Sequence, residues 1–178
     1  RLVLEGIHTY EGKGEPFREV RVLVESATPG LFSFSETGAG YESKELSFLG
    51  FVTLARETHF IALKQNGSQS TTSLEFEGNW QMMPLGEVVR YSVVSRSVYD
   101  SMGSIAPVKN TTECKVISAS RAEDLHPTLQ GVAKQHECRG LHDQYNQVLR
   151  AYFLQDYNYL VGIESSKSPF MYYSRRIT

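Results

Sequence analysis

The stretch Phe17-Arg18-Glu19-Val20-Arg21-Val22-Leu23-Val24 does most to decide the fold. Its valines recur at every second position, the period at which side chains point to one face of a strand. The Gly/Pro-rich segment Gly12–Pro16 precedes it, and Thr28-Pro29-Gly30 follows it; both are typical of turns. We therefore expect a half-buried β-strand between two turns.

Similar segments recur along the chain. In Leu74-Glu75-Phe76-Glu77 the period is also two, which predicts that Leu74 and Phe76 face the core and both glutamates face water. The segments that favour strands by composition and period are Leu2–Tyr10, Phe17–Val24, residues 31 to about 38, Leu46–Ala55, His59–Lys64, Thr72–Glu77, Val88–Tyr99, Cys114–Ser120, the chain from about Val148 onward and Phe170–Tyr173.

Three connections can also be predicted. Gln65–Ser68 contains an Asn-Gly step and is expected to form a tight hairpin turn. Ser101–Thr112 is expected to be a loop. Ser120-Arg121-Ala122-Glu123 matches a capping box, which predicts a helix of one or two turns ending before Pro127.

The fold class follows from this count of short strands. The prediction is an all-β or mostly β domain, an antiparallel sandwich or barrel with one or two short helices. With 178 residues and no long linker, we expect residues 1–178 to form a single β-rich domain. A barrel would leave room for a ligand, whereas a sandwich would work through its loops or a sheet face.

Charge and composition argue against several function classes. Lys and Arg number 18 against 20 Asp and Glu, and no stretch concentrates basic residues, so we expect no nucleic-acid partner. No run approaches the ~20 apolar residues of a membrane helix, so we expect a soluble chain without a transmembrane segment. The sequence contains no Gly-x-Ser-x-Gly element and no phosphate-binding loop that opens a helix. We therefore predict no catalytic residue and no cofactor.

The two cysteines, Cys114 and Cys138, admit three interpretations. The first is a disulfide, which indicates an oxidising compartment, periplasmic or secreted. The second is a pair of unrelated buried thiols. The third is a zinc site shared with His136 and His142, although no Cys-x-x-Cys pair supports it. We favour the disulfide and predict no metal.

Two groups of large side chains are candidate binding residues. Tyr is suited to partly wet contact surfaces, since its ring is apolar and its hydroxyl polar, and Met adapts its shape to irregular partners. An ordinary core role is the simpler interpretation of the tyrosines. The candidates are Trp80, Met82 and Met83 in the first group and Tyr157, Tyr159, Tyr172 and Tyr173 in the second.

Three functions remain compatible with these patterns. The first is a non-enzymatic periplasmic or secreted protein of inhibitor or immunity type, which binds another protein. The second is a β-barrel carrier of an apolar small ligand, with Trp80, Met82, Met83 and the tyrosines around the pocket. The third is an enzyme whose site is assembled only in three dimensions. We expect a protein partner rather than a small apolar ligand.

Overall fold

A computed structural model describes the chain apart from residues 1, 11–12, 39, 81, 142–146 and 167–170. The strands are β1 (Leu2–Tyr10), β2 (Lys13–Glu25), β3 (Leu31–Gly38), β4 (Tyr41–Phe48), β5 (Val52–Phe60), β6 (Gln65–Glu77), β7 (Val88–Tyr99), β8 (Gly103–Ser104), β9 (Val108–Arg121), β10 (Val132–Gly140), β11 (Val148–Leu154), β12 (Tyr159–Ser165) and β13 (Met171–Ile177). Two 3₁₀ turns, η1 (Ala122–Asp124) and η2 (Gln155–Tyr157), are the helical elements in the described chain.

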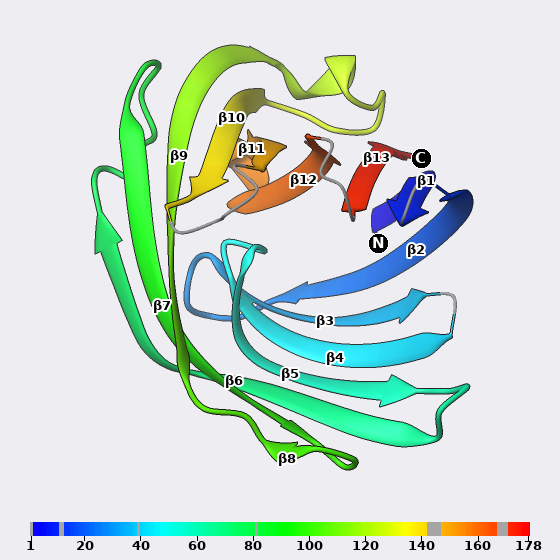
Figure 1. Ribbon diagram of the computed structural model, residues 1–178. Coiled ribbons are helices and arrows are strands. Elements are labelled where there is room, and N and C mark those ends of the chain that lie inside the picture. Colours follow the sequence, from blue (N-terminus) through cyan, green and yellow to red (C-terminus); the bar gives the residue numbers. More distant parts are fainter. Residues whose placement is uncertain (1, 11–12, 39, 81, 142–146, 167–170) are drawn as a thin grey trace.

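These strands form a closed antiparallel barrel (Figure 1). The hydrogen-bonded order is β6-β5-β4-β3-β2-β1-β13-β12-β11-β10-β9-β7, and β6 pairs with β7 to close the ring. The short β8 lies on the edge of β7. The terminal strands β1 and β13 pair with each other, so both ends of the chain lie side by side. The sequence left sandwich and barrel open, and the structure is a barrel.

Several local predictions are wrong. Lys13–Pro16 was predicted as part of a turn but belongs to β2, and the predicted strand His59–Lys64 ends at Phe60. Asn66-Gly67 lies inside β6, and the chain turns earlier, at Ile61–Lys64, where Lys64 takes a left-handed φ of 49°. Gly67 is needed for packing instead, because a Cβ there would lie 2.9 Å from the Tyr99 ring.

The predicted strand Leu46–Ala55 is also wrong, because the structure divides it. β4 ends at Phe48 and β5 begins at Val52, and the turn between them contains Leu49 and Gly50 at φ of 53° and 77°. A Cβ at Gly50 would lie 2.1 Å from Tyr159, so this turn packs directly against β12. The Leu49 carbonyl accepts a hydrogen bond from the Leu160 amide at 2.7 Å.

The remaining local predictions are confirmed in part. Val88–Tyr99 is a strand over its whole predicted length, but the predicted loop Ser101–Thr112 includes β8 and the start of β9. The predicted helix after Ser120 is the single turn η1, and no side chain caps it. The fold class, mostly β with one or two short helices, is confirmed.

β2 is buried on the face opposite to Val22 and Val24. Glu19 is buried on β2 and Arg21 and Leu23 are partly buried, whereas Val22 and Val24 are 49% and 60% exposed. The period of two is therefore correct, but it is Glu19 and Arg21 that point into the barrel.

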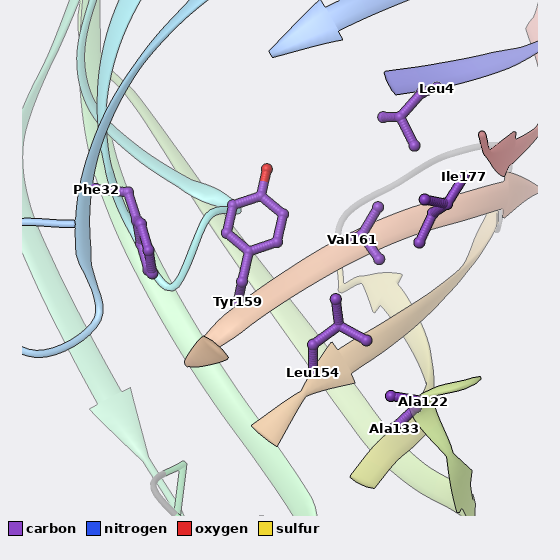
Figure 2. Packing of buried hydrophobic residues seen from close by; sticks show 8 residues of the cluster. All are labelled: Leu4, Phe32, Ala122, Ala133, Leu154, Tyr159, Val161 and Ile177. Carbon is purple, nitrogen blue, oxygen red and sulfur yellow. The ribbon is translucent and has the colours of Figure 1, made fainter. Parts of the chain in front are cut away.

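The apolar core has two parts. One part surrounds Tyr159 and is drawn in Figure 2, where Phe32 and Tyr159 lie next to each other with ring centroids 5.4 Å apart. The other is centred on Phe153 and Met83. Phe48, Val89 and Phe76 belong to the second part, and they lie where β4 and β6 end and β7 begins. That end of the barrel is therefore filled with apolar side chains.

Cys114 and Cys138 are directly opposite each other on β9 and β10, with an S–S distance of 2.09 Å. Both sulfurs are thus engaged in a disulfide, as the first interpretation of the cysteines predicted. Among the residues placed by the structure, no helix has the length and apolar character needed to cross a membrane.

Candidate functional site

The register of β2 to β7 brings polar side chains into one row on the inner face of the barrel. Each residue of the row is directly opposite the next one on the neighbouring strand. Because the strands alternate between inner and outer face, all members of the row point into the barrel. The row consists of Arg21, Glu36, Ser43, Thr58, Gly67 and Tyr99.

Arg21 is the centre of a buried ionic network at one end of this row. Its Nε lies 3.1 Å from the Glu36 carboxylate, and it also pairs with Glu19. Its Nη1 donates a hydrogen bond of 3.0 Å to the Tyr159 hydroxyl. β2 and β12 are not neighbours in the sheet, so this bond crosses the barrel interior.

A second arginine extends the network. Arg175 of β13 lies 3.3 Å from Glu19 and stacks over the Tyr173 ring at 5.0 Å. Tyr41 donates its hydroxyl to the other oxygen of Glu36. The network therefore joins β2, β3, β4, β12 and β13 through side chains alone.

Glu45 and Arg56 form a separate pair in the adjacent inner row. Arg56 Nε donates to Glu45 at 2.5 Å, and the Thr53 hydroxyl donates to the other carboxylate oxygen at 2.8 Å. The Glu45 side chain is 3% exposed, so removing Arg56 would leave an unpaired buried charge.

Charge states in the network follow from this geometry. Burial alone would lower the pKa of Arg21, but Tyr159, Glu19 and Glu36 outweigh it and raise this pKa above its ordinary value. Burial and the hydrogen bond to Glu36 raise the pKa of Tyr41. The arginine is thus a cation and the tyrosine neutral. Three inner carboxylates (Glu19, Glu36 and Glu45) face three guanidinium groups (Arg21, Arg56 and Arg175), so the ionic interior is balanced.

A cavity of about 230 Å³ adjoins the network. Tyr41 opens β4, Phe60 closes β5 and Tyr99 closes β7, so the cavity lies at the barrel end opposite the apolar one. We call it the mouth chamber. The residues that line it are Glu36, Tyr41, Ser43, Arg56, Thr58, Phe60, Gly67, Ser68, Gln69 and Tyr99.

One hydroxyl of the mouth chamber lacks a protein partner. Ser43 is 6% exposed, and no described group hydrogen-bonds to its Oγ. It lies between Glu36 and Thr58 in the inner row. A buried hydroxyl without a partner costs about 1–3 kcal/mol, which a bound polar ligand would offset.

The outer face of the same strands carries two adjoining hollows, of about 620 and 400 Å³. They share Ser35, Lys44 and Glu57, which follow one another across β3, β4 and β5. The smaller hollow is lined in part by the exposed Val22 and Val24. We call these the outer hollows.

The predicted tyrosines occupy different environments. Tyr159 is buried in the ionic network, and Tyr173 is partly buried beside Arg175. Tyr157 is 39% exposed, and its hydroxyl accepts a hydrogen bond from the Gln130 amide at 3.2 Å. Tyr172 lies on β13 opposite Thr9. Tyr157, Tyr159 and Tyr173 therefore form no single surface.

Trp80, Met82 and Met83 separate as well. Trp80 packs with Phe48 at a ring distance of 4.8 Å, and Met83 is 1% exposed in the same apolar cluster. Met82 is exposed, and its carbonyl accepts a hydrogen bond from Lys134. Trp80 and Met83 thus help to fill the apolar end of the barrel, away from the mouth chamber.

The third interpretation of the cysteines, a zinc site, loses both of its sulfur ligands to the disulfide. His136 is fully buried, and neither of its ring nitrogens has a partner in the described chain. His142 lies outside the described residues. Within the described ranges, no group of three or more His, Cys, Asp or Glu side chains is arranged to hold a metal.

Of the residues in the inner row and the network, Tyr159 and Tyr173 were among the predicted binding residues, and the others were not. Alternating Glu19 and Arg21 on one strand was a usable signal, since a charge pair at a spacing of two shares a face. Their partners Tyr159 and Arg175 lie 138 and 156 residues away, which no local pattern reports.

Comparison with protein-family models, with curated proteins and with solved structures finds no match.

Proposed function

We propose that this chain is a non-enzymatic binding protein that holds a small polar molecule in the mouth chamber. The observation that carries the proposal is the chamber itself: a cavity at the mouth of a closed barrel, lined by polar and aromatic side chains and adjoining a buried ionic network. Barrel mouths are a common place for ligand sites. The sequence suggested an apolar ligand for a barrel, whereas this lining favours a polar one.

The compartment we propose is an oxidising one, periplasmic or secreted. The support is the disulfide between Cys114 and Cys138, since such bonds persist mainly outside reducing compartments.

The test is a thermal-shift screen of the whole chain against soluble metabolites of several classes: amino acids, amines, carboxylates, nucleosides and sugars. Thr58→Phe places a ring in the chamber, and Thr58→Val keeps the volume but removes the hydroxyl. We expect at least one compound to raise the melting temperature of the wild type and of Thr58→Val but not of Thr58→Phe. If Thr58→Phe fails to fold, NMR shift changes confined to β3–β7 at the chamber give the same information.

Two results would overturn this proposal. One is a screen in which no compound stabilises the wild type. The other is a set of compounds that stabilise the wild type and a folded Thr58→Phe variant equally, because the site would then lie elsewhere.

A second candidate is the protein partner expected from the sequence, bound in the outer hollows. Val22 and Val24 offer an apolar surface, while Glu42, Glu57 and Asp100 around the larger hollow outnumber Lys44. A partner segment with apolar side chains followed by a Lys or Arg would complement this surface. Selection from a random peptide library should enrich peptides with that pattern, and these peptides should not bind Val24→Ser. Enriched peptides that lack the pattern, or that bind Val24→Ser as well as the wild type, would contradict this second candidate.

A further inference from the structure

We infer that the molecule bound in the mouth chamber is a neutral, hydroxyl-rich compound of about ten non-hydrogen atoms, such as a pentose or a small polyol. This inference rests on the proposed function and names its ligand class. It follows from the size, the charge and the hydrogen-bonding groups of the chamber, taken in that order.

Size sets the upper limit. A cavity of about 230 Å³ has room for about eight separate waters, taking ~30 Å³ for each, and for about ten covalently bonded non-hydrogen atoms, because bonded atoms lie closer together than neighbouring waters. Nucleotides, lipids and peptides of several residues exceed this volume. A single amino acid, a short diamine, a dicarboxylate or a five-carbon sugar would fit.

Charge separates these remaining classes. The carboxylate of Glu36 is already paired with Arg21, and the guanidinium of Arg56 is already paired with Glu45. A charged ligand would lose its hydration without meeting an uncompensated opposite charge, and that loss costs several kcal/mol per ion. A neutral ligand avoids this cost.

The hydrogen-bonding groups favour hydroxyls over other neutral groups. Ser43 and Thr58 face each other across β4 and β5, and Gln69 adds an amide with donors and an acceptor. Hydroxyls both donate and accept, so a ligand carrying several of them can satisfy such a mixed set. Phe60 and Tyr99 supply rings against which the C–H face of a sugar can pack.

Substitution of Ser43 should affect the stability of the free protein and ligand binding in opposite directions. In the free protein its buried Oγ has no partner within the described chain, so Ser43→Ala is expected to leave the melting temperature unchanged or raise it. If the ligand hydrogen-bonds to this hydroxyl, the same substitution weakens ligand binding. A group of merely structural importance would not show these two effects together.

The experiment is a calorimetric or NMR titration of the full chain with D-ribose, xylitol and erythritol as neutral probes and with zwitterionic glycine betaine, putrescine and succinate as charged probes. We expect at least one neutral probe to bind, Ser43→Ala to weaken it fivefold or more, and Ser70→Ala to leave it unchanged. Ser70 is the matched control because it carries the same hydroxyl on β6 but is exposed and lines neither the mouth chamber nor the outer hollows.

The outcomes separate the two proposals. Binding of a charged probe that Thr58→Phe abolishes would overturn the ligand class and leave the proposed function intact. Failure of all three neutral probes to bind would also overturn the ligand class. Binding of a neutral probe that is unaffected by Ser43→Ala and by Thr58→Phe would place the sugar outside the chamber and overturn both.

Discussion

The fully buried histidine of β10 provides a quantitative prediction about acid stability. His136 is 0% exposed, and in the part of the chain that the structure places neither ring nitrogen has a hydrogen-bond partner. Burial, with a smaller contribution from the charge of Lys134, lowers the pKa of His136 from 6.5 to about 4. The imidazole is therefore neutral in the folded protein at pH values where the unfolded chain already binds a proton.

The sign and size of the effect follow from proton linkage. Since the folded pKa is lower than the unfolded one, the unfolded state gains protons first as the pH falls from about 6.5 to about 4. The free energy of unfolding decreases over this range. A difference of about 2.5 pKa units, at 1.36 kcal/mol per unit, gives a loss of about 3 kcal/mol between pH 7 and pH 4.

The assay compares the wild type with His136→Leu by urea unfolding at pH 7, 6, 5 and 4. Leucine has a similar volume and no proton to bind, and carboxylates that titrate in both proteins cancel in the difference. We expect the stability of His136→Leu relative to the wild type to rise by about 3 kcal/mol from pH 7 to pH 4. His59→Gln, which alters an exposed histidine, is the control.

A difference between His136→Leu and the wild type that stays constant within about 0.5 kcal/mol over this pH range would refute the reasoning. It would mean that charging the buried imidazole costs little free energy, because the protonated ring hydrogen-bonds to a protein group or to water. A difference that falls with decreasing pH would show that protonated His136 is stabilised in the folded state.

Three further predictions concern the disulfide, the network and the outer face. Cys114→Ala/Cys138→Ala should lower the free energy of unfolding by about 3 kcal/mol, measured in urea, and alkylation of the unreduced wild type should leave its mass unchanged; free thiols would contradict this. Arg21→Met should cost about 3–5 kcal/mol by leaving buried carboxylates unpaired, and the loss in Arg21→Met/Glu36→Gln should be smaller than the sum of the two single losses; simple additivity would argue against coupling. Val24→Ser should change stability by less than about 0.5 kcal/mol, and a loss of 2 kcal/mol or more would place this side chain in the core instead.

The period of β2 could be predicted from the sequence, but not which of its faces is buried. Because successive side chains of a strand point to opposite faces, Glu19 and Arg21 share one face and Val22 and Val24 share the other. Hydrophobicity alone assigns the valines to the core. The structure reverses this assignment, because Arg175 and Tyr159 on distant strands supply partners for the charged side chains inside the barrel.

The positions of two turns were predicted wrongly for a related reason. Asn-Gly is a strong local turn signal, yet Gly67 is placed in β6 by the Tyr99 ring that occupies the space of its missing side chain. The turns that do form contain Leu49 and Lys64 at positive φ, which residues of these types rarely adopt. Packing between segments that lie far apart in the sequence therefore outweighs turn propensity at both places.

The distribution of polar groups along the barrel is the strongest reason to look for a ligand at its mouth. A barrel that needed only stability would be better filled with apolar side chains, because buried ion pairs are often no more stabilising than hydrophobic replacements. One end of this barrel is filled in that way, around Phe153 and Met83. The other end has charge pairs and a cavity. Since both ends belong to the same strands, the contrast argues for a role of the polar end beyond folding, which the Ser43→Ala titration measures directly.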